Sequence, residues 1–326
     1  MSRLTALAVS RTILNWFALA SLAANVGIVI TGGVVRLTGS GLGCPTWPRC
    51  TDDSYVTTAA MGIHGAIEFG NRMLTFVVGL LAVLCVVLAE ARRRAGGRDR
   101  TETRLALLVF AGIPAQAVIG GFTVLSDLNP WVVGLHFLAS MAVIAAAWAL
   151  VAATGAAPAP SWQAPTAVRR LGGVLVVVSA LVLVAGVVVT GSGPHAGDEK
   201  ARRTGLDPEM ISQLHVDLVM LLIGLSIAMV FVLKATEALA RTAVILLVVE
   251  LAQGLIGFVQ YFTHLPAALV AAHMGGSCLV WIATFAVYDV VRARVTAPAA
   301  DVVPASPPRL WPVADGGPPP GGDGPP

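Results

Sequence analysis

Eight apolar segments dominate the sequence, and each is about long enough to cross a lipid bilayer as a helix. They lie roughly at 13–35, 60–89, 105–125, 131–153, 171–190, 209–233, 242–262 and 267–290. Backbone groups in lipid must be hydrogen-bonded within the protein, and runs of this length meet that requirement as helices. Only 12% of the residues are charged, about half of the share usual in soluble domains. We therefore predict an all-α integral membrane protein with eight transmembrane helices.

Arginine and lysine are distributed unevenly between the loops. If the N-terminus is cytoplasmic, fifteen basic residues fall on the cytoplasmic side and five on the outer side. The positive-inside rule then predicts a bacterial plasma membrane protein with both termini in the cytoplasm. The net charge of +3 is too small to indicate binding to nucleic acid, so membrane lipid is the expected surrounding.

The two halves of the sequence repeat one another. The stretch "AQAVIGGFTVLSDLNPWVVGLHFLAS" begins at Ala115, and "AQGLIGFVQYFTHLPAALVAAHMGGS" begins at Ala252. Both read Ala-Gln-x-x-Ile-Gly, and both place a histidine twenty residues after the glutamine. An even number of helices in each half gives both halves the same orientation in the membrane. The repeat predicts two four-helix bundles related by a pseudo-twofold axis along the membrane normal.

The repeat and the composition together divide the chain into regions. The predicted regions are a cytoplasmic N-terminus at 1–12, an N-terminal bundle at 13–153 with an outer loop at 36–59, a cytoplasmic linker at 154–170, a C-terminal bundle at 171–290 and a tail at 291–326. The tail is rich in proline and has little that could pack, so we expect it to be disordered and cytoplasmic.

Four of the six histidines fall inside predicted helices, two in each half. They are His64, His136, His215 and His273. Each is expected six or seven residues into a helix that starts at the outer side, which is a depth of about 10 Å. A single such histidine could make an interhelical hydrogen bond. Four at one depth favour metal ligation, because ionisable side chains in lipid are costly. Two imidazoles facing each other across a four-helix bundle suit heme iron.

The helix at 60–89 carries an acid and a base below its histidine. His64, Glu68 and Arg72 follow one another at intervals of four residues and share a helix face. The corresponding helix of the second half keeps His215 but has no such acid and base. Either the pair is a structural ion pair, or Glu68 moves protons while Arg72 holds a heme propionate. The second interpretation places the chemistry in the first bundle.

The loop "GSGLGCPTWPRC" at 39–50 is rich in turn-forming residues. Cys44 and Cys50 enclose five residues, which is short enough for a disulfide. Such a bond would require an oxidising compartment outside the membrane. A structural staple and a redox role in passing electrons both remain open.

These motifs resemble the heme A synthase family, the bacterial CtaA type related to the mitochondrial enzyme. The likeness rests on "TGGVVRLTGSGLGCPTWPRC", "IEFGNR" and the helices containing "LHF" and "AHMGGS", and it covers 13–290. The resemblance implies oxidation of the C8 methyl group of heme O to a formyl group by successive hydroxylations, which yields heme A for cytochrome oxidase. It also implies that Glu68 is involved in the chemistry and that Cys44 and Cys50 are the paired cysteines of the outer loop.

The resemblance further implies two hemes. A heme b is expected between His215 and His273, and the substrate, heme O, in the first bundle. Expected partners are heme O synthase and an electron donor. The chain departs from the family at Asn71, where many members have a histidine in the pattern Glu-x-x-His-Arg. We predict that His64 and His136 hold the substrate heme, the alternative being His136 alone.

Two other functions are compatible with paired histidines. A cytochrome b-type quinol oxidoreductase would hold permanent hemes in both bundles, and the unequal helix at 60–89 argues against it. A heme transporter or chaperone would need a route to both membrane faces, and ligands near the outer side argue against that.

Overall fold

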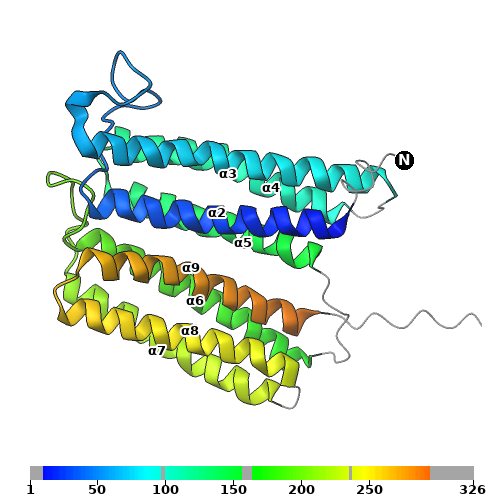
Figure 1. Ribbon diagram of the computed structural model, residues 1–326. Helices are drawn as coiled ribbons and strands as arrows, with labels where there is room; N and C mark the ends of the chain where they lie inside the picture. The colour runs from blue at the N-terminus through cyan, green and yellow to red at the C-terminus, as the bar shows by residue number, and fades with distance from the viewer. Residues whose placement is uncertain (1–9, 97–99, 156–163, 235–236, 294–326) are drawn as a thin grey trace, which may run out of the picture.

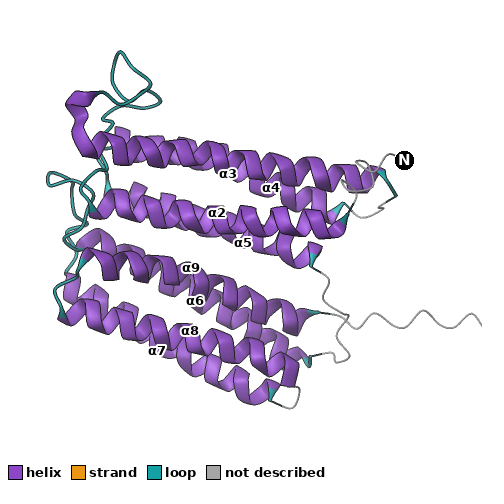
Figure 2. Ribbon diagram, viewed as in Figure 1, coloured by secondary structure: helices purple, strands orange, loops and turns teal. Residues whose placement is uncertain are grey.

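The computed structural model describes residues 10–96, 100–155, 164–234 and 237–293, and this part of the chain is helical with no strand (Figures 1 and 2). Its helices are α2 (Arg11–Leu37), the short 3-10 helix η1 (Ala59–Met61), α3 (Gly62–Arg94), α4 (Thr101–Leu125), α5 (Pro130–Thr154), α6 (Thr166–Ser192), α7 (Pro208–Leu233), α8 (Glu237–Phe262) and α9 (Ala267–Arg292). Eight of them are long and apolar enough to span a membrane, which confirms the predicted fold class. The predicted N-terminus, linker and tail lie partly or mostly outside the described residues.

The helices form two four-helix bundles that lie side by side (Figure 1). Helices α2, α3, α4 and α5 contact one another in a closed ring, and α6 to α9 do the same. Between the bundles, α2 contacts α9, α5 contacts α6, and α5 contacts α9. Exchanging α2 with α6 and α5 with α9 leaves this set of contacts unchanged, as a pseudo-twofold axis requires.

The turns that lead into α5 and α9 repeat the same backbone conformation. Asp127 and Leu128 have φ angles of 51° and 57°, and His264 and Leu265 have φ angles of 62° and 59°. Two successive non-glycine residues in the left-handed region are uncommon, so the shared turn supports the internal repeat. His264 is therefore a turn residue, the counterpart of Asp127.

Two tryptophan side chains form hydrogen bonds across the interface between the bundles. The Nε1–H group of Trp281 on α9 donates to the carbonyl oxygen of Met141 on α5, at 2.9 Å. Nearer the C-terminal ends of these two helices, the Nε1–H group of Trp148 on α5 donates to a carboxylate oxygen of Asp289 on α9, at 3.0 Å. Buried indole groups need such partners, and these two fix how α5 and α9 lie against each other.

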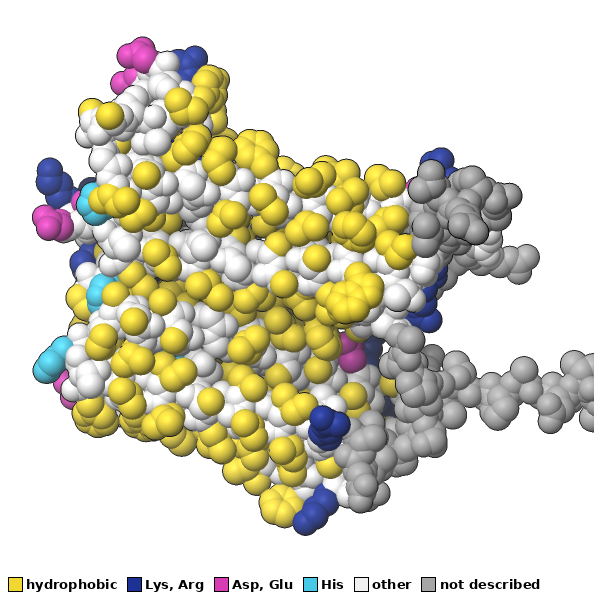
Figure 3. Space-filling model, in the orientation of Figure 1, with side chains coloured by type: hydrophobic (Ala, Val, Ile, Leu, Met, Phe, Trp, Pro, Cys, Tyr) yellow, Lys and Arg dark blue, Asp and Glu magenta, His cyan; other side chains and the backbone are white. Residues whose placement is uncertain are grey.

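On the face shown in Figure 3 the side of the molecule is mostly apolar, and charged side chains gather toward its two ends. We call the end that carries the loops at 38–58 and 193–207 the loop end. Arg36 lies at this end, where its Nη2 donates to the Thr190 carbonyl oxygen at 2.7 Å and its Nε donates to the His195 carbonyl oxygen. The loop end is thus held together across the two bundles by a partly buried guanidinium.

Candidate active site

His215 on α7 has its ring against α6, at a place where a side chain larger than that of glycine would make a tight contact. A Cβ atom at Gly186 would lie 3.2 Å from Cε1 of the ring. Nδ1 of His215 lies 3.1 Å from the carbonyl oxygen of Val182, four residues before Gly186. Since a carbonyl oxygen only accepts, Nδ1 carries the proton and Nε2 keeps its lone pair. This is the arrangement of a metal-binding histidine that is oriented by a backbone carbonyl.

His273 on α9 has a matching position against α8. A Cβ atom at Gly257 would lie 3.4 Å from Cε1 of the His273 ring. The backbone of Gln253, which precedes Gly257 by four residues on α8, is near the same ring. His215 and His273 are close enough to interact electrostatically. The structure therefore brings these two predicted residues together inside the second bundle, from diagonally opposite helices.

His136 on α5 repeats the setting of His273 in the first bundle. A Cβ atom at Gly120 on α4 would lie 3.2 Å from Cε1 of the ring. Gly120 and Gly257 are the glycines of the two Ala-Gln-x-x-Ile-Gly motifs. Nδ1 of His136 and Nδ1 of His273 are both buried without a hydrogen-bond partner among the described residues, so the two rings share this feature as well.

His64 lies elsewhere. It is the third residue of α3, whereas His136, His215 and His273 are the seventh or eighth of their helices. Its side chain is exposed, and its Nδ1 lies 2.9 Å from the hydroxyl oxygen of Ser40 in the loop. The position predicted from the sequence, six or seven residues after the helix start, therefore holds for three histidines and not for His64, because the chain enters α3 through η1 and the helix starts later than expected.

Glu68 and Arg72 hold the cysteine loop. Glu68 is buried; its Oε2 accepts the Cys44 backbone N–H at 2.6 Å, and its Oε1 accepts Nη2 of Arg72 at 2.6 Å. Arg72 also donates to the carbonyl oxygens of Cys44, Thr46 and Arg49 at 2.9 to 3.1 Å. The sequence placed Glu68 and Arg72 on one face, but it did not indicate that this face binds the loop backbone.

The cysteine loop is closed and packed onto the first bundle. Cys44 and Cys50 form a disulfide, as the sequence allowed, and both are fully buried. Gly43 lies against the backbone of His64, and Gly121 on α4 lies against the ring of Trp47, each with no space for a side chain. The loop thus covers the loop end of α3 and α4.

The other intramembrane acids lie apart from these groups. Glu250 on α8 is buried and accepts a hydrogen bond from the Ser226 hydroxyl at 2.8 Å. Asp217 is exposed, and its Oδ1 accepts Nε2 of Gln213 at 2.7 Å. Asp217 therefore faces away from His215, as its position two residues later predicts.

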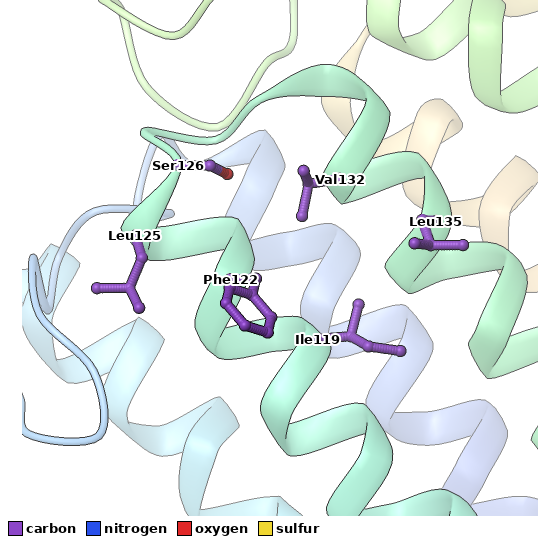
Figure 4. A pocket seen from close by; sticks show the side chains of 6 residues that line it. All are labelled: Ile119, Phe122, Leu125, Ser126, Val132 and Leu135. Atoms are coloured by element: carbon purple, nitrogen blue, oxygen red, sulfur yellow. The ribbon is translucent and has the colours of Figure 1, made fainter.

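Two open grooves lie on the outer sides of the first bundle. One, between α4 and α5, is lined by Ile119, Phe122, Leu125, Ser126, Val132 and Leu135 (Figure 4). The other lies between α3 and α4 and is also almost wholly apolar. Neither groove is lined by a titratable residue, so neither of them contains the candidate site.

The second bundle fits a bis-histidine heme. Its two imidazoles lie on diagonally opposite helices and interact electrostatically, His215 keeps its Nε2 lone pair, and each ring lies against a glycine of the neighbouring helix. A family model for cytochrome oxidase assembly proteins, COX15-CtaA, matches residues 15–197. The chain belongs to the COX15-CtaA family.

Several curated proteins are similar to this COX15-CtaA member. They include heme A synthases from Geobacillus kaustophilus (31% identical over 137 residues, 41% of each chain) and Lysinibacillus sphaericus (32% over 134 residues, 41% of this chain and 42% of the relative). A protoheme IX farnesyltransferase from Halobacterium salinarum is 32% identical over 162 residues, 47% of this chain and 34% of the relative. The chain thus spans about two fifths or less of the length of these relatives.

The glycine behind His215 provides a prediction for this COX15-CtaA protein. Gly186→Ala should displace the ring, because the new methyl group would lie 3.2 Å from Cε1, and should lower the heme content of the purified protein. Gly224→Ala on α7 is the matched control, since nothing lies within 4 Å of its Cβ position. Equal heme content in the two variants would show that the glycine does not position the histidine.

Proposed function

We propose that this protein is a heme A synthase, which oxidises the C8 methyl group of heme O to a formyl group by successive hydroxylations. The observation that carries the proposal is the pairing of His215 and His273 in one bundle, with Glu68 buried in the other. The relatives named heme A synthase support it. Two bundles of one fold would then have different tasks.

In the second bundle, His215 and His273 would hold a resident heme b. When bound, the heme supplies one-electron redox chemistry. The protein's part is to orient the ligands: the Val182 carbonyl fixes the tautomer of His215, and the glycines at 186 and 257 let both rings lie close to the neighbouring helices. Second-shell hydrogen bonds of this kind also raise the basicity of the ligand.

In the first bundle, His136 would hold the substrate, heme O, and Glu68 would handle protons beside it. Both carboxylate oxygens of Glu68 already accept hydrogen bonds, Oε1 from the guanidinium of Arg72 and Oε2 from the backbone N–H of Cys44. Oε2 has the neutral donor and is the atom that would accept a proton through its second lone pair. The five N–H donors of Arg72 are directed to Glu68 and to loop carbonyls. We therefore assign Arg72 to holding the loop; binding a propionate, as the sequence suggested, would require these bonds to break.

The surroundings of the protein also belong to the proposal. The uneven distribution of arginine and lysine supports a plasma membrane location with the loop end outside, where Cys44 and Cys50 can oxidise. Heme O synthase is the expected partner, because an enzyme that farnesylates protoheme would supply a farnesylated substrate. Electrons would come from a donor of the membrane.

Heme extraction tests the proposed function. A bacterial strain that makes heme O but lacks its own heme A synthase should accumulate heme A when it expresses this chain. The same strain with the vector alone is the control. Heme O without heme A, from cells in which the protein is present and carries heme b, would contradict the proposal and leave an electron-transfer role.

A further inference from the structure

Corresponding helices of the two bundles have buried residues at the same intervals along the sequence. Aligning these buried residues pairs positions of one helix with positions of its counterpart. Four buried residues of α7 correspond in spacing to four of α3: Leu222, Ser226, Met229 and Leu233 to Val78, Ala82, Cys85 and Ala89. Four of α6 correspond to four of α2: Gly172, Leu175, Ser179 and Leu183 to Ala18, Ser21, Asn25 and Val29. Continued along each helix, these spacings make Asn71 the counterpart of His215 and Gly32 the counterpart of Gly186.

The contacts of Asn71 agree with this correspondence. The nearest atom to a Cβ at Gly32 would be Nδ2 of Asn71, at 3.9 Å, just as the ring of His215 lies against Gly186. Oδ1 of Asn71 accepts a hydrogen bond of 2.7 Å from the hydroxyl of Thr31. Asn71 therefore stands at the fourth glycine-backed position, and histidines occupy the other three.

His64 cannot take over this position. It precedes Asn71 by seven residues on α3, which is about 10 Å along a helix. In the correspondence between α3 and α7, the counterpart of His64 is Pro208, the first residue of α7. Its ring is directed to Ser40 at the loop end. An imidazole side chain is too short to bridge that distance.

We propose that the first bundle holds its iron porphyrin through His136 alone, and that the face on the side of Asn71 is open to a small diatomic ligand. This inference rests on the proposed function only in assuming that a heme binds there. The carboxamide of Asn71 is a poor ligand for iron, and Thr31 occupies its oxygen. Its Nδ2–H₂ group remains as a donor that positions a ligand on the open face. The second bundle, with both places filled by imidazole, has no open face.

Carbon monoxide tests the inference, because it binds ferrous heme with one histidine ligand and not heme with two. The purified full-length protein is loaded with excess hemin, reduced with dithionite and exposed to carbon monoxide. The heme of the first bundle should bind the gas, and His64→Ala should bind it to the same extent. Asn71→His should lose the carbon monoxide signal, since it restores the missing imidazole. The low-spin signal of the second-bundle heme reports whether each variant is folded.

The outcomes separate this inference from the proposed function. Two hemes bound without any reaction with carbon monoxide would overturn the inference alone, and so would a carbon monoxide signal that appears only in His64→Ala. Uptake of a single heme despite excess hemin would overturn the inference, because the first bundle would then hold no iron porphyrin, whereas the proposed function is decided separately by the formation of heme A. If Asn71→His does not fold, the wild type and His64→Ala still decide.

Discussion

Replacement of His273 by alanine should abolish the low-spin heme spectrum of the purified protein. His215 and His273 lie on diagonally opposite helices of the second bundle, they interact electrostatically, and each ring lies against a glycine. Loss of either leaves the iron with one protein ligand, and a bis-histidine spectrum then cannot form. We expect His215→Ala to have the same effect, measured by absorption and electron paramagnetic resonance spectroscopy.

A matched control for this prediction is His195→Ala. His195 lies in the loop between α6 and α7, and it contacts Arg36 through its backbone carbonyl, which the substitution keeps. Burial, together with the nearby Arg36 and Arg203, lowers the pKa of His195, so the ring is neutral at pH 7 and its removal changes no charge. This variant should retain the low-spin spectrum. Survival of that spectrum in His273→Ala would show that the second-bundle heme is held by other residues.

Glu68→Gln should retain heme but lower the rate of heme A formation by roughly 10²–10⁴-fold, the range expected when a general acid or base is removed. None of the glycine-backed histidines contacts Glu68 through a hydrogen bond among the described residues, so heme binding should persist. Glutamine keeps the shape of the side chain but cannot take up a proton at Oε2. Extraction and chromatography of hemes from the complemented strain would measure the loss, including any hydroxylated intermediate.

The same substitution leaves Arg72 without its carboxylate, and an unpaired, partly buried charge is destabilising in its own right. The double variant Glu68→Gln/Arg72→Gln removes that charge together with the bonds of Arg72 to the loop, so Arg72→Gln alone is its control. If Glu68 handles protons, the double variant is less active than Arg72→Gln. Equal activity of the double variant and Arg72→Gln, or normal activity in Glu68→Gln, would reduce Glu68 to an anchor of the cysteine loop.

The eight helices were predictable because the membrane sets their length, and apolar runs of that length have few other folds available. The internal repeat was predictable from the shared Ala-Gln-x-x-Ile-Gly motif, and the structure extends it to the turns before α5 and α9 and to the pattern of burial. These features depend on residue type and spacing, which a single sequence contains.

The position of His64 relative to the start of α3 was not predictable from hydropathy. The apolar run extends back to Ala60, but the helix proper starts only at Gly62, which has a φ angle of 58° and ends the 3-10 turn of η1. Where a helix begins depends on such local turns. The binding of the loop by Glu68 and Arg72 was also hidden, because their partners are backbone groups, which leave no mark in the sequence. The glycines behind the histidines were visible, yet their role depends on which helices pack together.

The symmetry of the contact between the bundles bears on how such a chain could arise. In the contact between the bundles, α5 packs against its counterpart α9, and the contact of α2 with α9 is matched by that of α6 with α5. Two copies of a single four-helix ancestor would form the same symmetric contact in a homodimer. Duplication and fusion of that ancestral gene would release each half from the need to stay identical. Asn71 at the position that corresponds to His215 is such a difference between the halves, and two identical subunits of a homodimer could not differ in this way.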